Sequence, residues 1–483
     1  MPSIASTPTS RRRFLQIAGL SALAAPLHGK NILGANDTVR LGFIGCGGRA
    51  RSLAGQFSKL KDTSIVAVCD PDTKHMAQLA SGISKKTGRK PDEIRDYRKL
   101  LERKDIDAVV VATPNHWHVL HAIDAMAAGK DVYVEKPVSH GLWESRQLVA
   151  AEQKYGRIIQ AGLQNRSDPG PRDGFQFVRE GNLGKILSVD ICCFRNRHSI
   201  GKRTTPLKPP ATVDYNLWLG PAQDLPIHRG KFHYDWHWVW NTGNGDIGNQ
   251  APHEIDLANW LLDAKSPPAA VRTFGNRFGW NDAGQTPNLL TASYKISGVP
   301  CTIIVNDLTL APNRNVPGLY AGTRVGLVVH CEGGQLRGGR GGTYAVGTDG
   351  KKRIAKFPGD AGARHQRRFI DAVRSRRHAD IPACIADAAL AADIAHYANA
   401  SHRSGAPAAP QAIQAAFANN KAAQEIFADQ GKQLAAWGIE KPDYTLGRPL
   451  EIDPATGSVR TPDIAPELLR RTCRKEFTIP QLA

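Results

Sequence analysis

Residues 39–50 read Val39-Arg-Leu-Gly-Phe-Ile-Gly45-Cys-Gly47-Gly48-Arg-Ala50, an apolar run that ends in a cluster of glycines. The run is typical of a buried strand, and the G-x-G-x-x-A pattern is typical of a strand-to-helix turn that binds a dinucleotide. Gly45 permits the tight turn, Gly47 lets the backbone approach a pyrophosphate, and Ala50 leaves room for the helix to pack on the strand. We expect the phosphates at the N-terminus of a helix near residues 48–60, where free N–H groups favour an anion.

A second apolar run, 64–70, ends in Asp70, 25 residues after Gly45. This interval is close to the roughly 20 residues expected between the glycine turn and the acid that binds the ribose. A carboxylate at this place accepts hydrogen bonds from both ribose hydroxyls and repels a 2′-phosphate. The order of strand, glycine turn, helix, strand and acid therefore predicts a dinucleotide site that prefers NAD to NADP.

Strand-like and helical segments continue to alternate after Asp70. Residues 107–112 and 131–135 are strand-like, 118–128 is helical in pattern, and a further extended segment spans 156–162. This alternation predicts a parallel, doubly wound α/β sheet, whose ligands gather at the carboxyl ends of the strands. Two segments stand at those ends, Thr113-Pro-Asn-His-Trp-His118 and Glu135-Lys-Pro137.

These two segments, together with the glycine turn, resemble the Gfo/Idh/MocA family of glucose-fructose oxidoreductase, inositol dehydrogenase and relatives, over residues 38–403. The resemblance implies that the E-K-P motif holds the reactive-site lysine, Lys136, and that Asn115 and His118 line the nicotinamide side. A partly desolvated lysine beside a cationic ring should have a lowered pKa, and it could take a hydroxyl proton as hydride leaves the same carbon. A surface lysine in a turn is the alternative for Lys136, and a packed residue is the alternative for His116. The residues predicted to contact the cofactor are Gly45, Gly47, Gly48, Ala50, Asp70, Thr113, Pro114, Asn115, His118, Glu135, Lys136 and Pro137.

The pattern changes beyond residue 165, where short β runs follow one another with few helices between them. Such a run of strands predicts a second, α+β domain with an open and mainly antiparallel sheet. A long irregular stretch is expected at 196–240, and the glycine-rich residues 333–342 are predicted to form hairpin turns. Helices are expected at 363–376 and 386–402.

Residues 243–256 are similar to the family's D-x-x-x-H segment, in which the histidine joins the lysine in proton transfer. His253 matches that histidine, whereas Asn249 stands in place of the aspartate. An asparagine can hydrogen-bond a sugar hydroxyl but cannot act as a base. On helical spacing Asn249, His253 and Asp256 share a face, so Asp256 could orient the imidazole of His253.

Residues 232–240, Phe-His-Tyr-Asp-Trp-His-Trp-Val-Trp, are unusually aromatic. Rings with polar edges suit a sugar, because its C–H faces stack on them while its hydroxyls find polar partners. An aromatic plug that covers a sheet is the alternative. The residues predicted to bind the substrate are Asn249, Asp256, Trp236, His237 and Arg166.

Residues 10–16, Ser-Arg-Arg-Arg-Phe-Leu-Gln, precede the apolar run 17–27 and resemble a twin-arginine export signal. We therefore expect export by the twin-arginine machinery to the periplasm or beyond, with cleavage near Ala24 or Ala25. Past residue 30 no apolar run approaches the roughly 18–20 residues that span a bilayer. The mature chain is expected to be soluble.

The formal net charge of +19 raises the question of nucleic-acid binding. The Lys and Arg residues are scattered, and there is no basic helix, zinc-finger spacing or aromatic-basic sheet motif, so no nucleic-acid partner is predicted. The eight cysteines include no C-x-x-C pair. Free thiols are therefore expected, and no metal site is predicted.

The sequence thus predicts a signal at 1–35, an NAD(P)-binding Rossmann domain at 36–164, a substrate-binding and oligomerisation domain at 165–405, and an extension at 406–483. The predicted function is an NAD(P)-dependent oxidoreductase for sugar hydroxyls. Because an exported enzyme meets no diffusible NAD pool, its cofactor should stay tightly bound. A glycosidase or epimerase that oxidises its substrate transiently, and a non-catalytic sugar-binding protein, are the alternatives. A homo-oligomer is expected from the resemblance alone.

Overall fold

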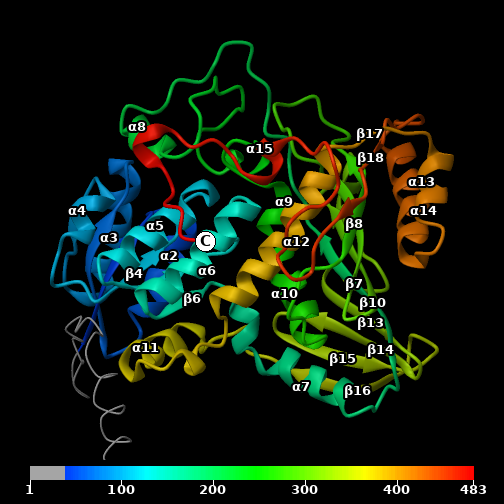
Figure 1. Cartoon of the computed structure of the whole chain (residues 1–483), viewed down its shortest axis with the longest axis horizontal. Coiled ribbons are helices and arrows are strands. Elements are labelled where there is room, and N and C mark those ends of the chain that lie inside the picture. The colour runs from blue at the N-terminus through cyan, green and yellow to red at the C-terminus, as the bar shows by residue number, and fades with distance from the viewer. Residues whose placement is uncertain (1–37) are drawn as a thin grey trace, which may run out of the picture. The chain divides into compact units, whose positions relative to one another are not determined.

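The computed structural model describes residues 38–483, coloured from blue to red in Figure 1. The predicted twin-arginine segment at residues 10–27 lies outside the described residues. Within residues 38–483 no helix is both long enough and apolar enough to cross a membrane.

The first sheet has six parallel strands in the order β3-β2-β1-β4-β5-β6, which confirms the predicted doubly wound arrangement. Its strands are β1 (Val39–Ile44), β2 (Thr63–Cys69), β3 (Asp92–Ile94), β4 (Ala108–Val111), β5 (Asp131–Val134) and β6 (Ile159–Ala161). The helices between them are α2 (Gly48–Phe57), α3 (Thr73–Thr87), α4 (Tyr97–Leu101), α5 (His118–Ala127) and α6 (Leu142–Tyr155). Every residue of β4 and β5 is buried, as expected for central strands that are covered on both faces.

The second sheet has eleven strands and is mainly antiparallel, as predicted, with β7 and β10 as its parallel pair. Ten of them follow the order β16-β15-β14-β13-β7-β10-β9-β8-β18-β17, and β19 pairs with β8. The strands are β7 (Ile186–Phe194), β8 (Ala270–Asn276), β9 (Leu289–Ile296), β10 (Val299–Asn306), β13 (Val325–Cys331), β14 (Gly334–Gly339), β15 (Gly342–Val346), β16 (Arg353–Pro358), β17 (Ala406–Pro407), β18 (Thr445–Leu446) and β19 (Leu450–Glu451). A separate two-stranded ribbon joins β11 (Thr309–Ala311) to β12 (Arg314–Pro317).

The prediction of hairpin turns at 333–342 is wrong over most of its length, because β14 occupies Gly334–Gly339. Gly334 and Gly338 have φ angles of 144° and 118°. A Cβ at these two positions would lie 2.1 and 2.5 Å from the backbone oxygens of Val346 and Gly342, respectively. The glycines are therefore needed because the neighbouring strand approaches too closely for a side chain.

One long helix, α12 (Ile385–Arg403, labelled in Figure 1), contributes residues to the hydrophobic cores of both sheets. Its residues Ala388, Ala389 and Ala392 belong to the core of the first sheet. Ile394 and Tyr397, on another part of its surface, belong to the core of the second sheet. The small alanine side chains on α12 let neighbouring elements pack close to the helix. Because α12 takes part in both cores, it holds the two sheets in a fixed arrangement.

The remaining helices connect and cover the two sheets. The predicted irregular stretch at 196–240 is confirmed, since it contains only α8 and one short 3₁₀ turn, η3. The α-helices are α7 (Pro169–Arg179), α8 (Tyr215–Leu219), α9 (Gly245–Asn249), α10 (Ala251–Leu261), α11 (His365–Ser375), α13 (Pro410–Ala416), α14 (Lys421–Ala436) and α15 (Pro466–Leu469). The 3₁₀ turns are η1 (Asn115–Trp117), η2 (Gln164–Ser167), η3 (Asp235–Trp238), η4 (His378–Asp380) and η5 (Lys475–Phe477).

The last segment of the chain runs back from the second sheet to the first, as the red ribbon in Figure 1 shows. It leaves the second sheet after β19, and its residues Phe477 and Ile479 enter the core of the first sheet. The ring of Phe477 packs edge-on against Trp117, with centroids 5.3 Å apart. The C-terminal segment therefore helps to hold Trp117 and its neighbours, which follow β4, in place.

Candidate active site

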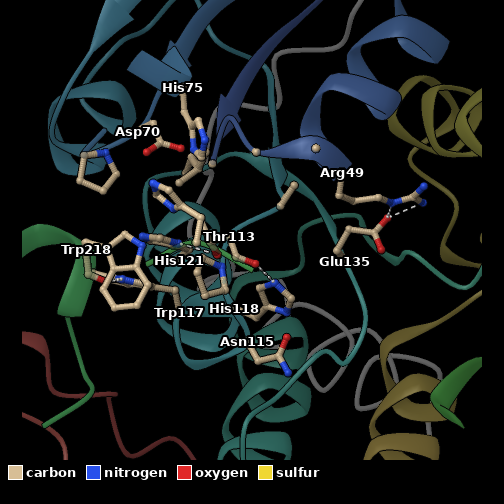
Figure 2. Close-up of a pocket in the computed structure, with 18 of the residues that line it drawn as sticks. Arg49, Asp70, His75, Thr113, Asn115, Trp117, His118, His121, Glu135 and Trp218 are labelled. Atoms are coloured by element: carbon tan, nitrogen blue, oxygen red, sulfur yellow. Dashed lines mark hydrogen bonds and ion pairs between the residues drawn. The ribbon is translucent and has the colours of Figure 1, made fainter. Parts of the chain in front are cut away.

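A cavity of about 680 Å³ opens at the carboxyl ends of β1, β2, β4 and β5. This is the edge at which an open α/β sheet binds its ligands. Figure 2 shows the residues after these strands, with Asp70 and His75 drawn toward one side of the view and the Arg49–Glu135 ion pair toward the other. Of the residues predicted for the site, the following line the cavity: Gly45, Gly47, Gly48, Asp70, Thr113, Pro114, Asn115, His118, Glu135, Lys136, Trp236, His237 and Asn249.

The glycine turn after β1 has the geometry that a dinucleotide requires. Gly45 adopts a φ of 90°, and a Cβ there would lie 2.7 Å from the carbonyl oxygen of Ala112. A Cβ at Gly47 would meet nothing within 4 Å, so the space beside the start of α2 is open to a ligand. Ala50 is fully buried and packs behind the turn, where it acts through the fit of α2 and not by lining the cavity.

Asp70 stands at the end of β2 and is held by two backbone N–H groups. Cys46 N–H donates to its Oδ2 at 2.6 Å, and Asp72 N–H donates to its Oδ1 at 2.8 Å. Burial raises the pKa of Asp70 to about 7, although these two hydrogen bonds oppose the shift. The carboxyl group lines the cavity, in the position from which it can accept from ribose hydroxyls.

Lys136 follows β5, and its amine is held by Asn249 from α9. The Lys136 Nζ donates to the backbone oxygen of Asn249 and, at 3.2 Å, to its Oδ1. Asn249 Nδ2 in turn donates to Asp246 Oδ1 at 2.9 Å, and the Asp246 carboxylate accepts from Arg197 at 2.7 and 2.8 Å. Burial lowers the pKa of Lys136 to about 8, so about a fifth of the amine is neutral near physiological pH.

Glu135, beside Lys136, forms a buried ion pair that the sequence did not indicate. Arg49 Nε donates to Glu135 Oε1 at 2.8 Å, and Gln164 Nε2 donates to the same oxygen at 3.3 Å. Burial acts to raise the pKa of Glu135, but the charges of Arg49 and Lys136 outweigh it and hold the pKa below its ordinary value. A Cβ at Gly162 would lie 2.6 Å from Oε1, so that glycine makes room for the carboxylate.

The residues after β4 are fixed by backbone carbonyls and by each other. The two ring nitrogens of His118 lie 2.6 Å from the Pro137 oxygen and 2.8 Å from the Thr113 oxygen. Pro137 therefore acts through His118 and does not itself line the cavity. Asn115 Nδ2 donates to Asn244 Oδ1 at 3.0 Å. His116 is fully buried, as its packed interpretation requires.

An aromatic wall, made of Tyr234, Trp236 and His237, lines the cavity from the segment around η3. The rings of Trp236 and His237 stack with centroids 3.6 Å apart. Nδ1 of His237 donates to the Tyr234 carbonyl oxygen at 2.5 Å, which leaves Nε2 as an acceptor. Burial lowers the pKa of His237 to about 3, so the ring is neutral and suited to accept a hydrogen bond from a hydroxyl.

Arg166, His253 and Asp256 are not among the residues that line the described cavity. The prediction that Asp256 orients His253 is wrong, because both oxygens of the Asp256 carboxylate accept from Arg166 at 2.8 Å. The full charge of a guanidinium holds a buried carboxylate more strongly than a neutral ring would. Nδ1 of His253 is buried and has no hydrogen-bond partner among residues 38–483. Arg166 and Asp256 thus form a structural ion pair and do not contact a substrate in this cavity.

Several lining residues were not predicted from the sequence. His121 stacks on Trp117, with centroids 4.2 Å apart and an angle of 5°, and Trp218 accepts from Trp117 through its backbone oxygen. Arg49 lies inside the glycine motif itself, so it could have been predicted as a site residue from its position close to the expected phosphates. Others, such as Trp218 and His233, come from segments that are distant in the sequence, and only the fold brings them to the cavity.

Two models of one family match the two parts of the chain that line this cavity. The model of the oxidoreductase family's NAD-binding Rossmann fold matches residues 39–163, and the model of its C-terminal alpha/beta domain matches residues 176–306. Together they span more than half of the chain. The chain belongs to the GFO/IDH/MocA oxidoreductase family. Its Rossmann half carries the glycine turn, Asp70 and Lys136 described above.

Known relatives resemble this GFO/IDH/MocA member over part or most of its length. Glycosyl hydrolase family 109 protein 2 of Shewanella sp. (strain ANA-3) is 38% identical over 224 residues, which cover 42% of this chain and 48% of that protein. The chain thus matches about half the length of this curated relative. The WlbA dehydrogenase from Bordetella pertussis, solved with NADH and UDP-GlcNAcA, has a TM-score of 0.56 at 19% identity and covers 76% of this chain and 97% of its own. The aldose-aldose oxidoreductase from Caulobacter crescentus, complexed with glycerol, has a TM-score of 0.53 at 16% identity, with 74% and 95% covered. The two solved structures show the shared fold.

Proposed function

We propose that the protein is an NAD-dependent oxidoreductase that moves hydride between a carbohydrate hydroxyl and a tightly bound nicotinamide cofactor. The observation that carries the proposal is the place of Lys136. Its amine, with a pKa lowered to about 8, lies in one cavity with the glycine turn, Asp70 and the aromatic wall. A proton acceptor, a dinucleotide cradle and a surface for a sugar are thereby combined at one place.

The residues present fit NAD. The open space at Gly47 and the N–H groups at the start of α2 match the pyrophosphate. The carboxyl group of Asp70 matches the adenosine ribose. When bound, the nicotinamide ring supplies the hydride acceptor. The Asp70 carboxylate disfavours a 2′-phosphate, which supports NAD over NADP.

Proton transfer is assigned to Lys136. In its neutral form the amine can accept the proton of the reacting hydroxyl, and the charged form can return it. Asn249 Oδ1 and the Asn249 backbone oxygen orient the amine toward the cavity. His237 Nε2 is free to accept from a second hydroxyl, and the ring of Trp236 offers a face for the sugar's C–H groups.

A second candidate function is a glycosidase that oxidises its substrate transiently. The relatives matched at 32–38% identity over about half of the chain or less are named as glycosyl hydrolase family 109 proteins, which favours this alternative. Oxidation of a ring carbon to a ketone acidifies the neighbouring C–H, so a glycosidic oxygen at the next carbon can leave. Water would then add to the resulting enone at the carbon that lost the aglycone, the neighbouring carbon would regain a proton, and the reduced cofactor would return the hydride to the ketone. This cycle needs the same Lys136 and the same NAD site.

The test begins with the purified mature protein. Extraction with acid should release NAD⁺, or extraction with alkali should release NADH, and one sugar from a panel should change the reduced-nicotinamide absorbance. Lys136→Ala should keep the dinucleotide and lose about 10²–10⁴-fold in turnover, whereas Lys185→Ala, at an exposed lysine, should change nothing. A Lys136→Ala enzyme with parental turnover, or a parent that cannot be loaded with dinucleotide, would overturn the proposal.

Deuterium oxide separates the two candidate functions. A net oxidoreductase changes the redox state of its cofactor and leaves the substrate's carbon skeleton bonded to its aglycone. A transient-oxidation glycosidase releases the aglycone of an aryl glycoside without net change in NADH, and it incorporates solvent deuterium beside the oxidised carbon.

Export remains part of the proposal. The run Ser10-Arg-Arg-Arg-Phe-Leu-Gln supports translocation by the twin-arginine machinery to the periplasm or beyond. Residues 1–40 fused to a folded reporter should carry it out of the cytoplasm, and replacement of Arg11 and Arg12 by lysine should retain it there. A reporter exported equally well with both lysines would contradict this route.

A further inference from the structure

Two imidazoles and a carboxylate come together at the cavity, and none of them has a role in the proposed hydride or proton transfer. Asp72 precedes α3, His75 lies in the first turn of α3, and His233 comes from the irregular segment just before η3. His233 Nε2 lies 2.9 Å from Asp72 Oδ2, and His75 Nδ1 lies 3.8 Å from the same oxygen. The three ligand atoms all lie within 4.8 Å of one another.

Backbone contacts hold the two segments together independently of these side chains. Asp72 and Val213 form an antiparallel β-bridge. Thr73 N–H donates to the Thr212 oxygen at 3.0 Å, and Asp214 N–H donates to the Pro71 oxygen at 2.9 Å. The irregular segment is thus fixed against the start of α3 at Val213, and Phe232, the neighbour of His233, shares a buried hydrophobic cluster with Val213.

The carboxylate of Asp72 is itself oriented for a ligand. Its Oδ1 accepts from Lys74 N–H at 2.9 Å as the N-cap of α3, which turns Oδ2 toward the two imidazole rings. The rings of His75 and His233 lie side by side, with centroids 4.2 Å apart and an angle of 40° between their planes. Asp72 is almost fully buried, whereas both histidine side chains remain partly exposed and line the cavity, so an ion could enter.

A hydrogen bond between Asp72 and His233 explains only two of the three groups. Zinc lies about 2.0–2.2 Å from its nitrogen and oxygen ligands, which places neighbouring ligands of a tetrahedral ion about 3.4 Å apart. The distances of 2.9 and 3.8 Å from Asp72 Oδ2 bracket that separation. Two imidazoles and one carboxylate form a donor set that suits Zn²⁺ and leaves a position open for water.

We propose that Asp72, His75 and His233 bind a divalent transition-metal ion, with Zn²⁺ as the best match. The ion would link α3 to the segment that carries the aromatic wall, because His233 directly precedes Tyr234. A bound ion would therefore hold that wall in place over the cavity and stabilise the fold. The ion would take no part in the hydride transfer itself, and its binding can be tested without knowledge of the sugar.

The test uses tag-free, chelator-treated full-length mature protein and ZnCl₂ as the probe. Calorimetry should show one Zn²⁺ per chain, and His75→Gln and His233→Ala should each weaken binding by more than about tenfold. His228→Ala is the matched control, since His228 is an exposed histidine of the same irregular segment and should bind Zn²⁺ like the parent. Cobalt(II) should give visible absorption bands of a tetrahedral site in the parent and the control only. A parent without stoichiometric binding would overturn the proposal, as would His75→Gln and His233→Ala proteins that bind like the parent.

Thermal melting separates a metal site from a purely structural contact. His75→Gln leaves the Asp72–His233 hydrogen bond in place, so without metal its melting temperature should equal that of the parent. Saturating Zn²⁺ should raise the melting temperature of the parent and not that of His75→Gln, because only an ion that binds the folded state stabilises it. An equal rise in both proteins would overturn the assignment of His75 as a ligand.

Discussion

At the residue scale, the amine of Lys136 is held by an amide where the family resemblance implies a carboxylate. Asn249 Oδ1 accepts from Lys136 at 3.2 Å without adding a negative charge. Burial is the main cause that lowers the pKa of Lys136 to about 8; the charge of Arg49 acts in the same direction, and the charges of Glu135 and Asp246 act to raise the pKa. A carboxylate at position 249 would favour the ammonium form further and would lower the fraction of neutral base.

The substitution Asn249→Asp therefore should shift the pH profile of kcat/KM. Lys136 must be neutral to accept a proton, so activity rises with pH through its pKa, and a raised pKa moves this limb to higher pH. We expect a shift of about one unit and a loss of about tenfold in kcat/KM at pH 7. Asn249→Ala is the matched control, because it removes the side-chain contact without adding charge and should lower activity without moving the limb upward. Identical limbs in Asn249→Asp and the parent would contradict the role of charge at this position.

At the element scale, the aromatic wall depends on a glycine that lies beyond it in the sequence. A Cβ at Gly243 would lie 2.3 Å from the carbonyl oxygen of His237, whereas Gly82, in α3, would accept a Cβ with nothing within 4 Å. Gly243→Ala should push His237 and Trp236 out of place and raise KM for the sugar at least about tenfold, while bound dinucleotide is retained. Gly82→Ala, at an exposed helical site, should leave KM unchanged. Steady-state kinetics and dinucleotide extraction measure both effects, and an unchanged KM in Gly243→Ala would show that the wall does not contact the substrate.

Secondary-structure elements differ in how well they can be predicted from the sequence alone. Five of the six strands of the first sheet and the glycine turn were predictable because apolar runs, glycine geometry and the acid after β2 are local signals, whereas the short edge strand β3 (Asp92–Ile94) gave no such signal. The strand at Gly334–Gly339 was missed, since its glycines are required by the approach of another strand and resemble turn residues in the sequence. Asp256 was misassigned because helical spacing places it near His253 but does not reveal Arg166, which lies 90 residues earlier in the chain. The cluster of Asp72, His75 and His233 depends likewise on a contact between distant segments.

At the scale of the whole molecule, the C-terminal segment links the second sheet to the cofactor cavity. Phe477 is 1% exposed in the core of the first sheet, and its ring packs against Trp117, which lines the cavity. Phe417 is buried to a similar degree but belongs to a cluster on the second sheet, around Phe274 and Tyr444. Two buried phenylalanines therefore offer a matched pair, of which only one supports the wall of the cavity.

Phe477→Ala and Phe417→Ala should each destabilise the fold by about 3–5 kcal/mol, because each leaves a cavity in a packed core. Only Phe477→Ala should also weaken the retention of NAD, since the loss of its ring frees Trp117 and the residues after β4. Urea unfolding measures the first effect, and the rate of dinucleotide loss on dilution of the folded protein measures the second. Equal retention in both variants would mean that the segment stabilises the fold without supporting the site. Faster loss in Phe477→Ala alone would show that the end of the chain, which lies more than 350 residues after Trp117 in the sequence, helps to hold the cofactor.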